Sequence, residues 1–160
     1  MHPDVLEQLF REHYNSTLLY ALSLAKDRST AEELVSTAFY KALKSDDKEI
    51  VSFKSWLLTV VRNTFLSQAR KWWRQAELSE HLHDDGEELL ERIIKDEEYR
   101  ALYHALSLLP PLQNEMITLF YFENLSMREI AKVVKKSESN VKTTLCRARM
   151  KLKELLEGEI

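Results

Sequence analysis

The stretch from Leu125 to Glu157, LSMREIAKVVKKSESNVKTTLCRARMKLKELLE, contains two separate signals for helix N-termini. Ser126 and Glu129 have the Ser-x-x-Glu spacing of a capping box, in which the two residues bind each other's backbone N–H groups. Apolar residues then recur at helical spacing up to Val134, and Ser137 supplies a second cap three residues later. The pattern predicts a short helix, a tight turn and a longer helix.

The longer helix is predicted to have one buried and one exposed face. The buried stripe is expected to contain Val141, Leu145, Ala148, Leu152 and Leu155 or Leu156. The opposite face is expected to carry Ser139, Asn140, Thr143, Arg147 and Met150, with Lys142 and Arg149 at its flanks. Hydroxyl, amide and guanidinium groups at a helix N-terminus can bind base edges, and flanking cations neutralise phosphates. We interpret the pair as a helix-turn-helix with its second helix in the major groove; a generic helical hairpin with a solvated basic face is the alternative.

The composition of the 160 residues predicts an all-α fold. Two glycines and three prolines, with abundant leucine, alanine, glutamate and lysine, favour long helices with few tight turns. The length allows two small helical domains. One cysteine, Cys146, excludes an internal disulfide framework, and no apolar run approaches the roughly 20 residues that span a bilayer. We therefore expect a cytoplasmic protein without direct membrane insertion.

The charge is divided unevenly along the chain. The overall net charge of −3 combines +2 over residues 1–74, −8 over residues 75–98 and +3 over residues 99–160. The acidic strip contains Asp84-Asp85-Gly86, which interrupts any helical period. We predict a first domain over residues 1–74, an acidic flexible linker over 75–96 with a helix resuming near Glu87, and a second domain over 97–160.

Amphipathic helices are predicted through most of the first domain. One is expected to begin with a cap at Ser29–Thr30, and another near Phe53 or Ser55. The second of these ends in the unusual RKWWR, residues 70–74. Extrapolating its apolar stripe predicts that Trp72 is mostly buried, whereas Trp73 lies on an edge face. Its polar stripe contains Thr59, Asn63, Ser67, Arg70 and Arg74, and this stripe is the predicted DNA surface.

Three segments together resemble an extracytoplasmic-function (ECF) RNA polymerase sigma factor. LPPLQNEMITLFYFENLSMREIAKVVKKSESNVKTTLCRARMKLKELL, residues 109–156, is similar to region 4, which reads the minus-35 promoter element. AEELVSTAFYKALK, residues 31–44, resembles region 2.2, which docks on the clamp of the polymerase. FKSWLLTVVRNTFLSQARKWWR, residues 53–74, resembles regions 2.3 and 2.4, which open and read the minus-10 element.

The resemblance implies a role for individual residues. Polymerase contacts are implied for Glu32, Glu33, Val35, Ser36 and Phe39, although core packing is an equal alternative for Phe39. Asn63 matches the polar position that supports a base-capturing loop, here about residues 45–52, and Ser67, Arg70 and Arg74 continue that face. Minus-35 contacts are implied for Lys142, Thr143 and Arg147, with Ser139 and Asn140 where the family usually has Gly-Thr. Lys135 and Lys136 replace the glycine and aliphatic residue usual in the turn, where a left-handed non-glycine residue costs about 1 kcal/mol.

The implied partners are core RNA polymerase, promoter DNA and an anti-sigma factor, which in this family is often membrane-anchored. The linker is either a solvated tether or a strand that occupies the cationic RNA path of the polymerase. No cofactor and no catalytic group are expected, and the His81, His83, Asp84 and Asp85 cluster lacks a rigid frame for a metal. Two other functions remain open. One is a stand-alone helix-turn-helix regulator with a dimerising or sensing domain. The other is a metal-dependent helical enzyme built on that cluster.

Overall fold

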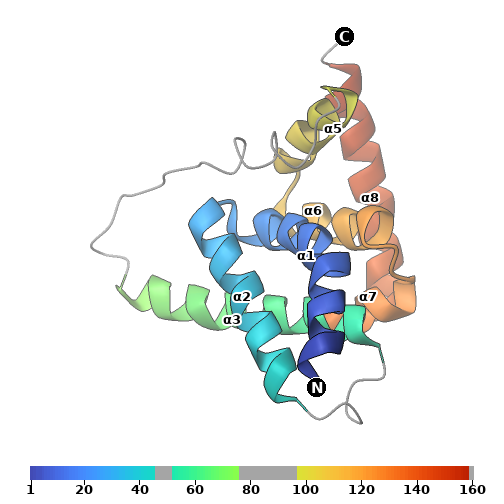
Figure 1. Cartoon of the computed structure of the whole chain (residues 1–160). Helices are drawn as coiled ribbons and strands as arrows, with labels where there is room; N and C mark the ends of the chain where they lie inside the picture. Colours follow the sequence, from blue (N-terminus) through green and yellow to red (C-terminus); the bar gives the residue numbers. More distant parts are fainter. Residues whose placement is uncertain (46–51, 76–96, 159–160) are drawn as a thin grey trace. The chain divides into compact units, whose positions relative to one another are not determined.

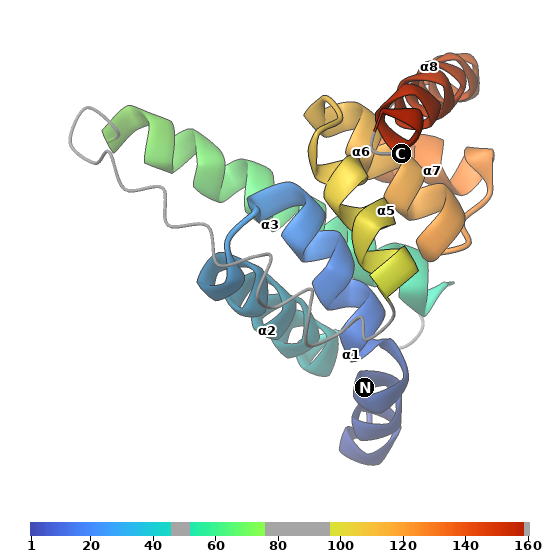
Figure 2. The ribbon, with the colours of Figure 1, turned by 90° about the horizontal axis from the view of Figure 1, so that it is seen from above.

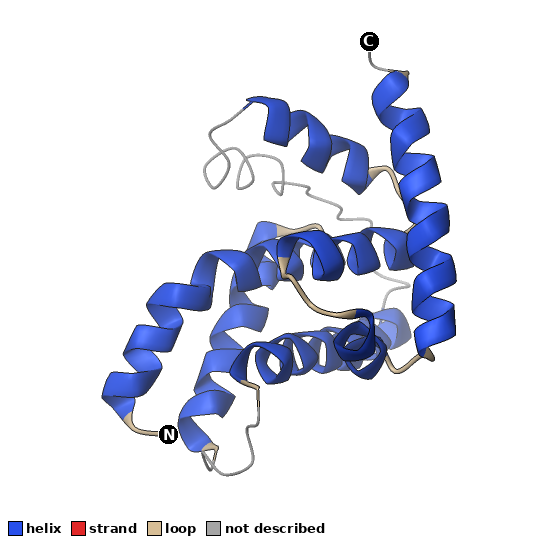
Figure 3. Cartoon of the chain, turned by 90° about the vertical axis from the view of Figure 1, so that its right-hand side faces the viewer, coloured by secondary structure: helices blue, strands red, loops and turns tan. Residues whose placement is uncertain are grey.

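The computed structural model describes residues 1–45, 52–75 and 97–158, and this part of the chain is helical with no strand (Figures 1 and 3). The prediction of an all-α fold is confirmed. The chain divides into two compact units, Met1–Asp85 and Gly86–Ile160. The division falls inside the predicted linker. That linker, the helix expected near Glu87, most of the base-capturing loop and the His81 to Asp85 cluster lie outside the described residues.

The first unit contains three helices, α1 (Pro3–Ala25), α2 (Arg28–Lys44) and α3 (Phe53–Gln75). The cap predicted at Ser29–Thr30 is wrong by two residues. Asp27 is the N-cap of α2, and its carboxylate accepts from the backbone N–H of Thr30 at 2.9 Å and from the Thr30 hydroxyl at 2.6 Å. The chain turns sharply just before this cap, because Lys26 ends α1 in the left-handed conformation. The start of α3 at Phe53 agrees with the prediction.

The three helices of the first unit pack around a small apolar core. Its fully buried members include Tyr20, Leu34, Leu57, Leu58 and Val35. Aromatic rings close one end of the bundle: Phe39 of α2 lies 4.9 Å from Phe10 of α1 and 6.2 Å from Phe53 of α3, centroid to centroid. This contact fixes the start of α3, and therefore the direction of its polar stripe, against the other two helices.

The second half of α3 extends beyond α1 and α2 (Figures 1 and 2). The buried residues of α3 are Leu57, Leu58 and Val61, all in its first nine positions. From Leu66 onward no side chain of the helix is buried. A helix gains most of its stability from packing one face, so the projecting half presents most of its surface to solvent or to a partner.

The second unit consists of α5 (Glu97–Ser107), α6 (Pro111–Ile117), a π-helical turn η3 (Thr118–Phe122), α7 (Met127–Val134) and α8 (Glu138–Glu157). α6 continues directly into η3, where the helix widens to the π form. The N–H of Glu123 donates to the carbonyl of Thr118, five residues back, at 3.0 Å. This π turn brings Phe122 into a stacked contact with Tyr103 of α5, at 4.8 Å between ring centroids.

The helix-turn-helix follows the predicted pattern closely. Ser126 and Glu129 form the complete capping box, and the Ser137 hydroxyl accepts from the N–H of Asn140 at 3.0 Å. Lys135 ends α7 with φ 57°, in the left-handed region, and the N–H of Lys136 closes the turn on the carbonyl of Ala131 at 3.0 Å. Lys135, which is not a glycine, therefore occupies the strained left-handed position of this turn, as the sequence predicts.

Candidate nucleic-acid and polymerase interface

The exposed face of α8 brings together all five residues predicted to read the minus-35 element. Val141, Leu145 and Ala148 are completely buried, as expected for the inner stripe. The side chains on the other side of the helix are all exposed: Ser139, Asn140, Lys142, Thr143 and Arg147. Leu152, Leu155 and Leu156 are half-buried, so the inner stripe weakens towards the C-terminus.

Hydrogen bonds within α8 orient part of this face. The Thr143 hydroxyl donates to the carbonyl of Ser139 at 3.0 Å, and the Thr144 hydroxyl donates to Oδ1 of Asn140 at 3.3 Å. With Oδ1 engaged, the Asn140 side chain presents its NH2 group as a donor. The face therefore offers donors from Asn140, Lys142 and Arg147, which match the acceptor atoms of guanine and thymine edges and of phosphates.

The side chain of Arg149, two residues beyond Arg147, contacts η3 of the second unit. Its Nε donates to the hydroxyl of Tyr121 at 2.5 Å. Its guanidinium carbon also lies 5.4 Å from the Phe120 ring centroid and 5.5 Å from that of Tyr121. The cation expected to flank the DNA face is thus held against η3, and the contact joins α8 to that turn.

The polar stripe of α3 is half-buried at Thr59 and exposed from Asn63 onward. Asn63, Ser67, Arg70 and Arg74 are all exposed, and they recur at three- and four-residue intervals on one side of the helix. Arg70 Nε donates to the backbone carbonyl of Leu66 at 3.3 Å. The helix contains lysine and arginine but no acidic residue between Phe53 and Gln75. Its surface therefore favours a polyanion.

The prediction that Trp72 is mostly buried is wrong. Trp72 is 47% exposed and its neighbour Trp73 is 74% exposed. The apolar stripe that begins at Leu58 and Val61 runs along a helix that leaves the bundle before it reaches these rings. The helical period and the composition do not show where the packing partners of a helix end. The exposure of Trp72 could therefore not be predicted from the sequence.

The five residues predicted to meet the polymerase separate into two groups on α2. Glu33 and Ser36 are exposed, and Glu32 is half-buried with Oε1 3.3 Å from Nε of Arg28. Val35 is completely buried and Phe39 is 5% exposed. Both pack in the core, and contact of Val35 and Phe39 with the polymerase stays a prediction. Phe39 forms the floor of a shallow apolar groove of about 310 Å³, lined also by Pro3, Leu6, Glu7, Phe10 and Leu43.

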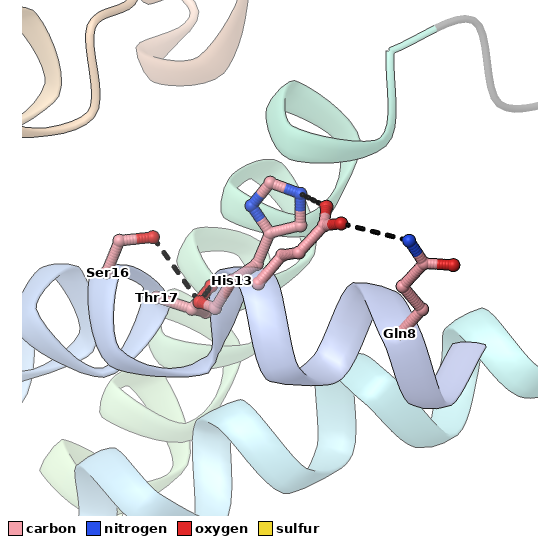
Figure 4. Close-up of polar contacts among 5 residues, drawn as sticks. Gln8, His13, Ser16 and Thr17 are labelled. Carbon is pink, nitrogen blue, oxygen red and sulfur yellow. Dashed lines mark hydrogen bonds and ion pairs between the residues drawn. The ribbon is translucent and has the colours of Figure 1, made fainter. Parts of the chain in front are cut away.

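His13 connects α1 to the beginning of α3. Its ring lies 5.6 Å from the Phe53 ring, centroid to centroid. Its Nε2 lies 3.9 Å from a carboxylate oxygen of Glu12, the contact drawn as a dashed line at His13 in Figure 4. The backbone carbonyl of His13 accepts from the hydroxyl of Thr17 at 2.6 Å. Burial lowers the pKa of His13 below its ordinary value; the positive charge of Lys54 lowers it further, and Glu12 partly opposes both.

Two other classes of site, a metal centre and a membrane-spanning helix, are not found among the described residues. Over residues 1–45, 52–75 and 97–158, no group of three or more histidine, cysteine, aspartate or glutamate side chains is arranged to hold a metal ion. None of the helices in that part of the chain is both long enough and apolar enough to cross a membrane. The single cysteine, Cys146, is exposed on α8.

Both units match known protein families. Residues 9–75 match the family model Sigma-70 region 2, and residues 99–152 match Sigma-70, region 4. The chain is 31% identical over 167 residues to RNA polymerase sigma factor YlaC of Bacillus subtilis, covering 96% of this chain and 92% of that one. It is 29% identical over 158 residues to the ECF RNA polymerase sigma factor SigM of the same organism, covering 94% of each.

Two solved structures have a similar fold. The sigma factor RpoE of Bartonella quintana, crystallised in complex with the anti-sigma factor NepR, is 27% identical and gives a TM-score of 0.74, covering 94% of this chain and 96% of that one. CnrH, solved in complex with the cytosolic domain of CnrY, is 22% identical with a TM-score of 0.70, covering 99% and 92%. The CnrH comparison supports the fold alone.

Proposed function

The chain belongs to the ECF group of RNA polymerase sigma factors, and on this premise we propose which of its surfaces performs each step of promoter recognition. A sigma factor directs core polymerase to promoters. The alternative of a stand-alone regulator is not favoured, because both units match sigma domains. In the proposed assignment the chain acts in the cytoplasm and contributes specificity only, while the chemistry of RNA synthesis belongs to the polymerase.

Minus-35 recognition is assigned to the exposed face of α8. The observation that carries this assignment is the division of the helix into a buried side, with Val141, Leu145 and Ala148, and an exposed donor-rich side. A helix of this kind enters the major groove with its N-terminal residues at the base edges. Ser137 caps that end by accepting from the backbone N–H of Asn140 at 3.0 Å, and the NH2 group of the Asn140 side chain is left to reach a base edge.

Minus-10 recognition is assigned to the polar stripe of α3. Asn63 and Ser67 supply neutral donors and acceptors, and Arg70 and Arg74 supply phosphate contacts. The absence of any acidic residue in α3 supports this, because a carboxylate beside the DNA backbone would repel it. Docking on the polymerase is assigned to the exposed residues Glu33 and Ser36 of α2 and to the half-buried Glu32, with Val35 and Phe39 beside them in the core.

A regulatory partner is part of the proposal. RpoE of Bartonella quintana, to which this chain is 27% identical, was crystallised with the anti-sigma factor NepR. We expect a protein of that class to hold this chain inactive by covering its polymerase-binding and DNA-binding surfaces. A small protein encoded beside this chain is the first candidate. It should bind the purified chain and prevent its association with core polymerase, whereas a protein that binds without that effect would not be the regulator.

Promoter binding by the reconstituted holoenzyme tests the assignment of α8. Arg147→Ala should weaken binding to a promoter about 10- to 100-fold through a lost base contact. Lys142→Ala should weaken binding to all promoters alike and reduce the slope of log K against log salt by about 1 through a lost phosphate contact. Binding to core polymerase should be unchanged in both variants. If polymerase binding falls instead, α8 is a docking helix and the assignment is wrong.

A further inference from the structure

Two side chains at one edge of the exposed face of α8 are joined to each other. The Thr144 hydroxyl donates to Oδ1 of Asn140 at 3.3 Å. The two residues are four apart, so their side chains meet on the same side of the helix. Asn140 is exposed, whereas Thr144 is half-buried and directly precedes the fully buried Leu145. No DNA contact is assigned to Thr144, so the proposed function does not use its hydroxyl.

The hydrogen bond determines how the amide of Asn140 is turned. The oxygen and the nitrogen of an amide point in different directions from one carbon atom. Oδ1 is directed along α8 towards Thr144, at the less exposed edge of the face. The nitrogen is consequently directed away from that edge. The amide therefore offers its NH2 group outward, while its oxygen is engaged within the protein.

The other polar contacts of this turn leave the orientation of the amide to Thr144. The backbone N–H of Asn140 donates to the hydroxyl of the N-cap Ser137 at 3.0 Å, which fixes the backbone and not the side chain. The Thr143 hydroxyl donates to the backbone carbonyl of Ser139 at 3.0 Å, so its single proton is used there. Of the two threonine hydroxyls, only that of Thr144 donates to the Asn140 amide.

The orientation of the amide decides which base it can recognise. An asparagine reads adenine through two hydrogen bonds, one from its NH2 group to N7 and one from the N6 amino group to Oδ1. When Oδ1 faces Thr144, the amide cannot form both bonds at once. It retains the donor, which suits N7 and O6 of guanine and O4 of thymine. Cytosine presents an amino donor in the major groove and gives this NH2 group no acceptor.

We propose that Thr144 is a specificity-determining residue of the minus-35 contact, and that it acts through Asn140. It holds the amide so that Asn140 selects guanine or thymine over adenine at one base of the element. Thr144 is a positioning residue, because this role requires no contact of its own with DNA. The inference rests on the proposed function, which places the exposed face of α8 in the major groove.

Selection from a promoter library by the reconstituted holoenzyme tests the proposal. The library is randomised over the minus-35 element, and the bound fraction is sequenced for each variant. Asn140→Ala identifies the base concerned, as the position at which a preference is lost. At that base Thr144→Val should raise the ratio of adenine to guanine or thymine about three- to tenfold, because the freed oxygen then accepts from adenine.

The valine and serine variants form a matched pair at position 144. Valine keeps the branched shape of threonine and removes the donor, whereas Thr144→Ser keeps the donor and should retain the wild-type preference. A merely structural role of Thr144 would weaken binding to every library member alike and leave the ratio between bases unchanged. An unchanged ratio in Thr144→Val would therefore overturn the proposal. A wild-type preference for adenine or cytosine would also overturn it, since both require the amide oxygen to face the groove.

A double-variant cycle shows whether Thr144 acts through Asn140. In the Asn140→Ala background Thr144→Val should leave the base preference unchanged, because no amide remains to be turned. The same shift with and without Asn140 would mean that Thr144 meets the DNA itself, which would overturn the proposal.

The same selections distinguish the inference from the function on which it rests. A preference that depends on Asn140 but not on Thr144 would remove the inference and leave the assignment of α8 intact. If neither Asn140→Ala nor Arg147→Ala alters any preference or weakens promoter binding, the assignment of α8 to the minus-35 element is wrong, and the inference is overturned with it.

Discussion

Arg149 of α8 and Tyr121 of η3, 28 residues apart in the chain, are joined by a hydrogen bond of 2.5 Å from Nε to the phenolic oxygen. Arg147, two residues earlier, is exposed on the proposed DNA face. Arg149→Ala should lower the free energy of unfolding of the second unit by about 1 to 2 kcal/mol, because it removes the hydrogen bond and the cation–π contacts. Arg147→Ala should change it by less than about 0.5 kcal/mol. Amide hydrogen exchange of α8 measures both.

The two arginines should show the reverse order in DNA binding. Arg147→Ala weakens promoter binding, whereas Arg149→Ala has a smaller effect when measured well below its unfolding temperature. Tyr121→Phe retains the ring and removes the acceptor, so it should reproduce part of the loss of stability. Equal effects of the two arginine variants in both measurements would mean that Arg149 contacts DNA as well.

The observed cap of α2 predicts a clear difference between two nearby side chains. Asp27→Ala removes the acceptor of the Thr30 N–H and should lower the free energy of unfolding of the first unit by about 1 to 2 kcal/mol. Ser29→Ala, at the exposed position that the sequence pattern favours, should have an effect within about 0.5 kcal/mol. Denaturant unfolding followed by tryptophan fluorescence suits the test, because Trp56 lies in this unit. A larger loss for Ser29→Ala would contradict the observed cap.

The left-handed conformation of Lys135 predicts a stabilising substitution. Lys135→Gly should raise the free energy of unfolding of the second unit by about 1 kcal/mol, because glycine has no Cβ to clash at φ 57°. Lys132→Gly is the matched control. It lies within α7 and is exposed, so it should destabilise the unit by about 1 kcal/mol.

The same substitution tests a role for Lys135 in binding. If its ammonium meets a phosphate, Lys135→Gly should reduce the salt slope of promoter binding by about 1 while stability rises. An unchanged slope would mean that Lys135 contacts no phosphate and affects only the stability of the turn. Loss of stability in Lys135→Gly would show that φ is not positive there.

The environment of His13 predicts how the stability of the first unit depends on pH. The folded pKa is below the unfolded value, so the unfolded state binds more protons between the two values. The contribution of His13 is fully present above the unfolded pKa, near 6.5, and is lost as the pH falls below it. His13→Gln should flatten the decline between pH 6.5 and the folded pKa.

Each charged neighbour of His13 has its own expected effect. Lys54→Met removes a positive charge that opposes protonation of His13. The first unit should therefore lose less stability as the pH falls. Glu12→Gln should make the decline steeper for the opposite reason. His104→Gln, in the second unit, is the control and should not alter it. The urea midpoint of each variant, read from tryptophan fluorescence across this pH range, measures the size of the decline. A larger decline for Lys54→Met than for Glu12→Gln would contradict the prediction.

Local signals in the sequence predicted the second unit better than the first. The capping box at Ser126, the cap at Ser137 and the buried side of α8 depend on residues within a few positions of one another, and all are present. The exposure of Trp72 depends on where α1 and α2 stop covering α3, which is a tertiary property. The π turn before Glu123 gives no sequence pattern of its own.

In the candidate site too, features set by the local sequence were predicted, whereas contacts between distant residues were not. The faces of α8 and α3 follow from helical period, so Arg147 and Asn63 were expected on exposed sides and lie there. Val35 shares the period of the buried stripe, which by itself predicts burial, whereas the family resemblance implies a contact with a partner. The engagement of Arg149 with Tyr121 links residues far apart in the chain, and no local pattern reports it.

Transcription by core RNA polymerase reconstituted with this chain tests the central claim most directly. A library of promoter fragments is transcribed with core enzyme alone and with core enzyme plus the purified chain, and the start sites are mapped. We predict discrete starts that require the chain, preceded by two shared elements near minus-10 and minus-35, with the upstream preference altered by Arg147→Ala. Starts that are the same with and without the chain, despite its binding to core enzyme, would contradict the account.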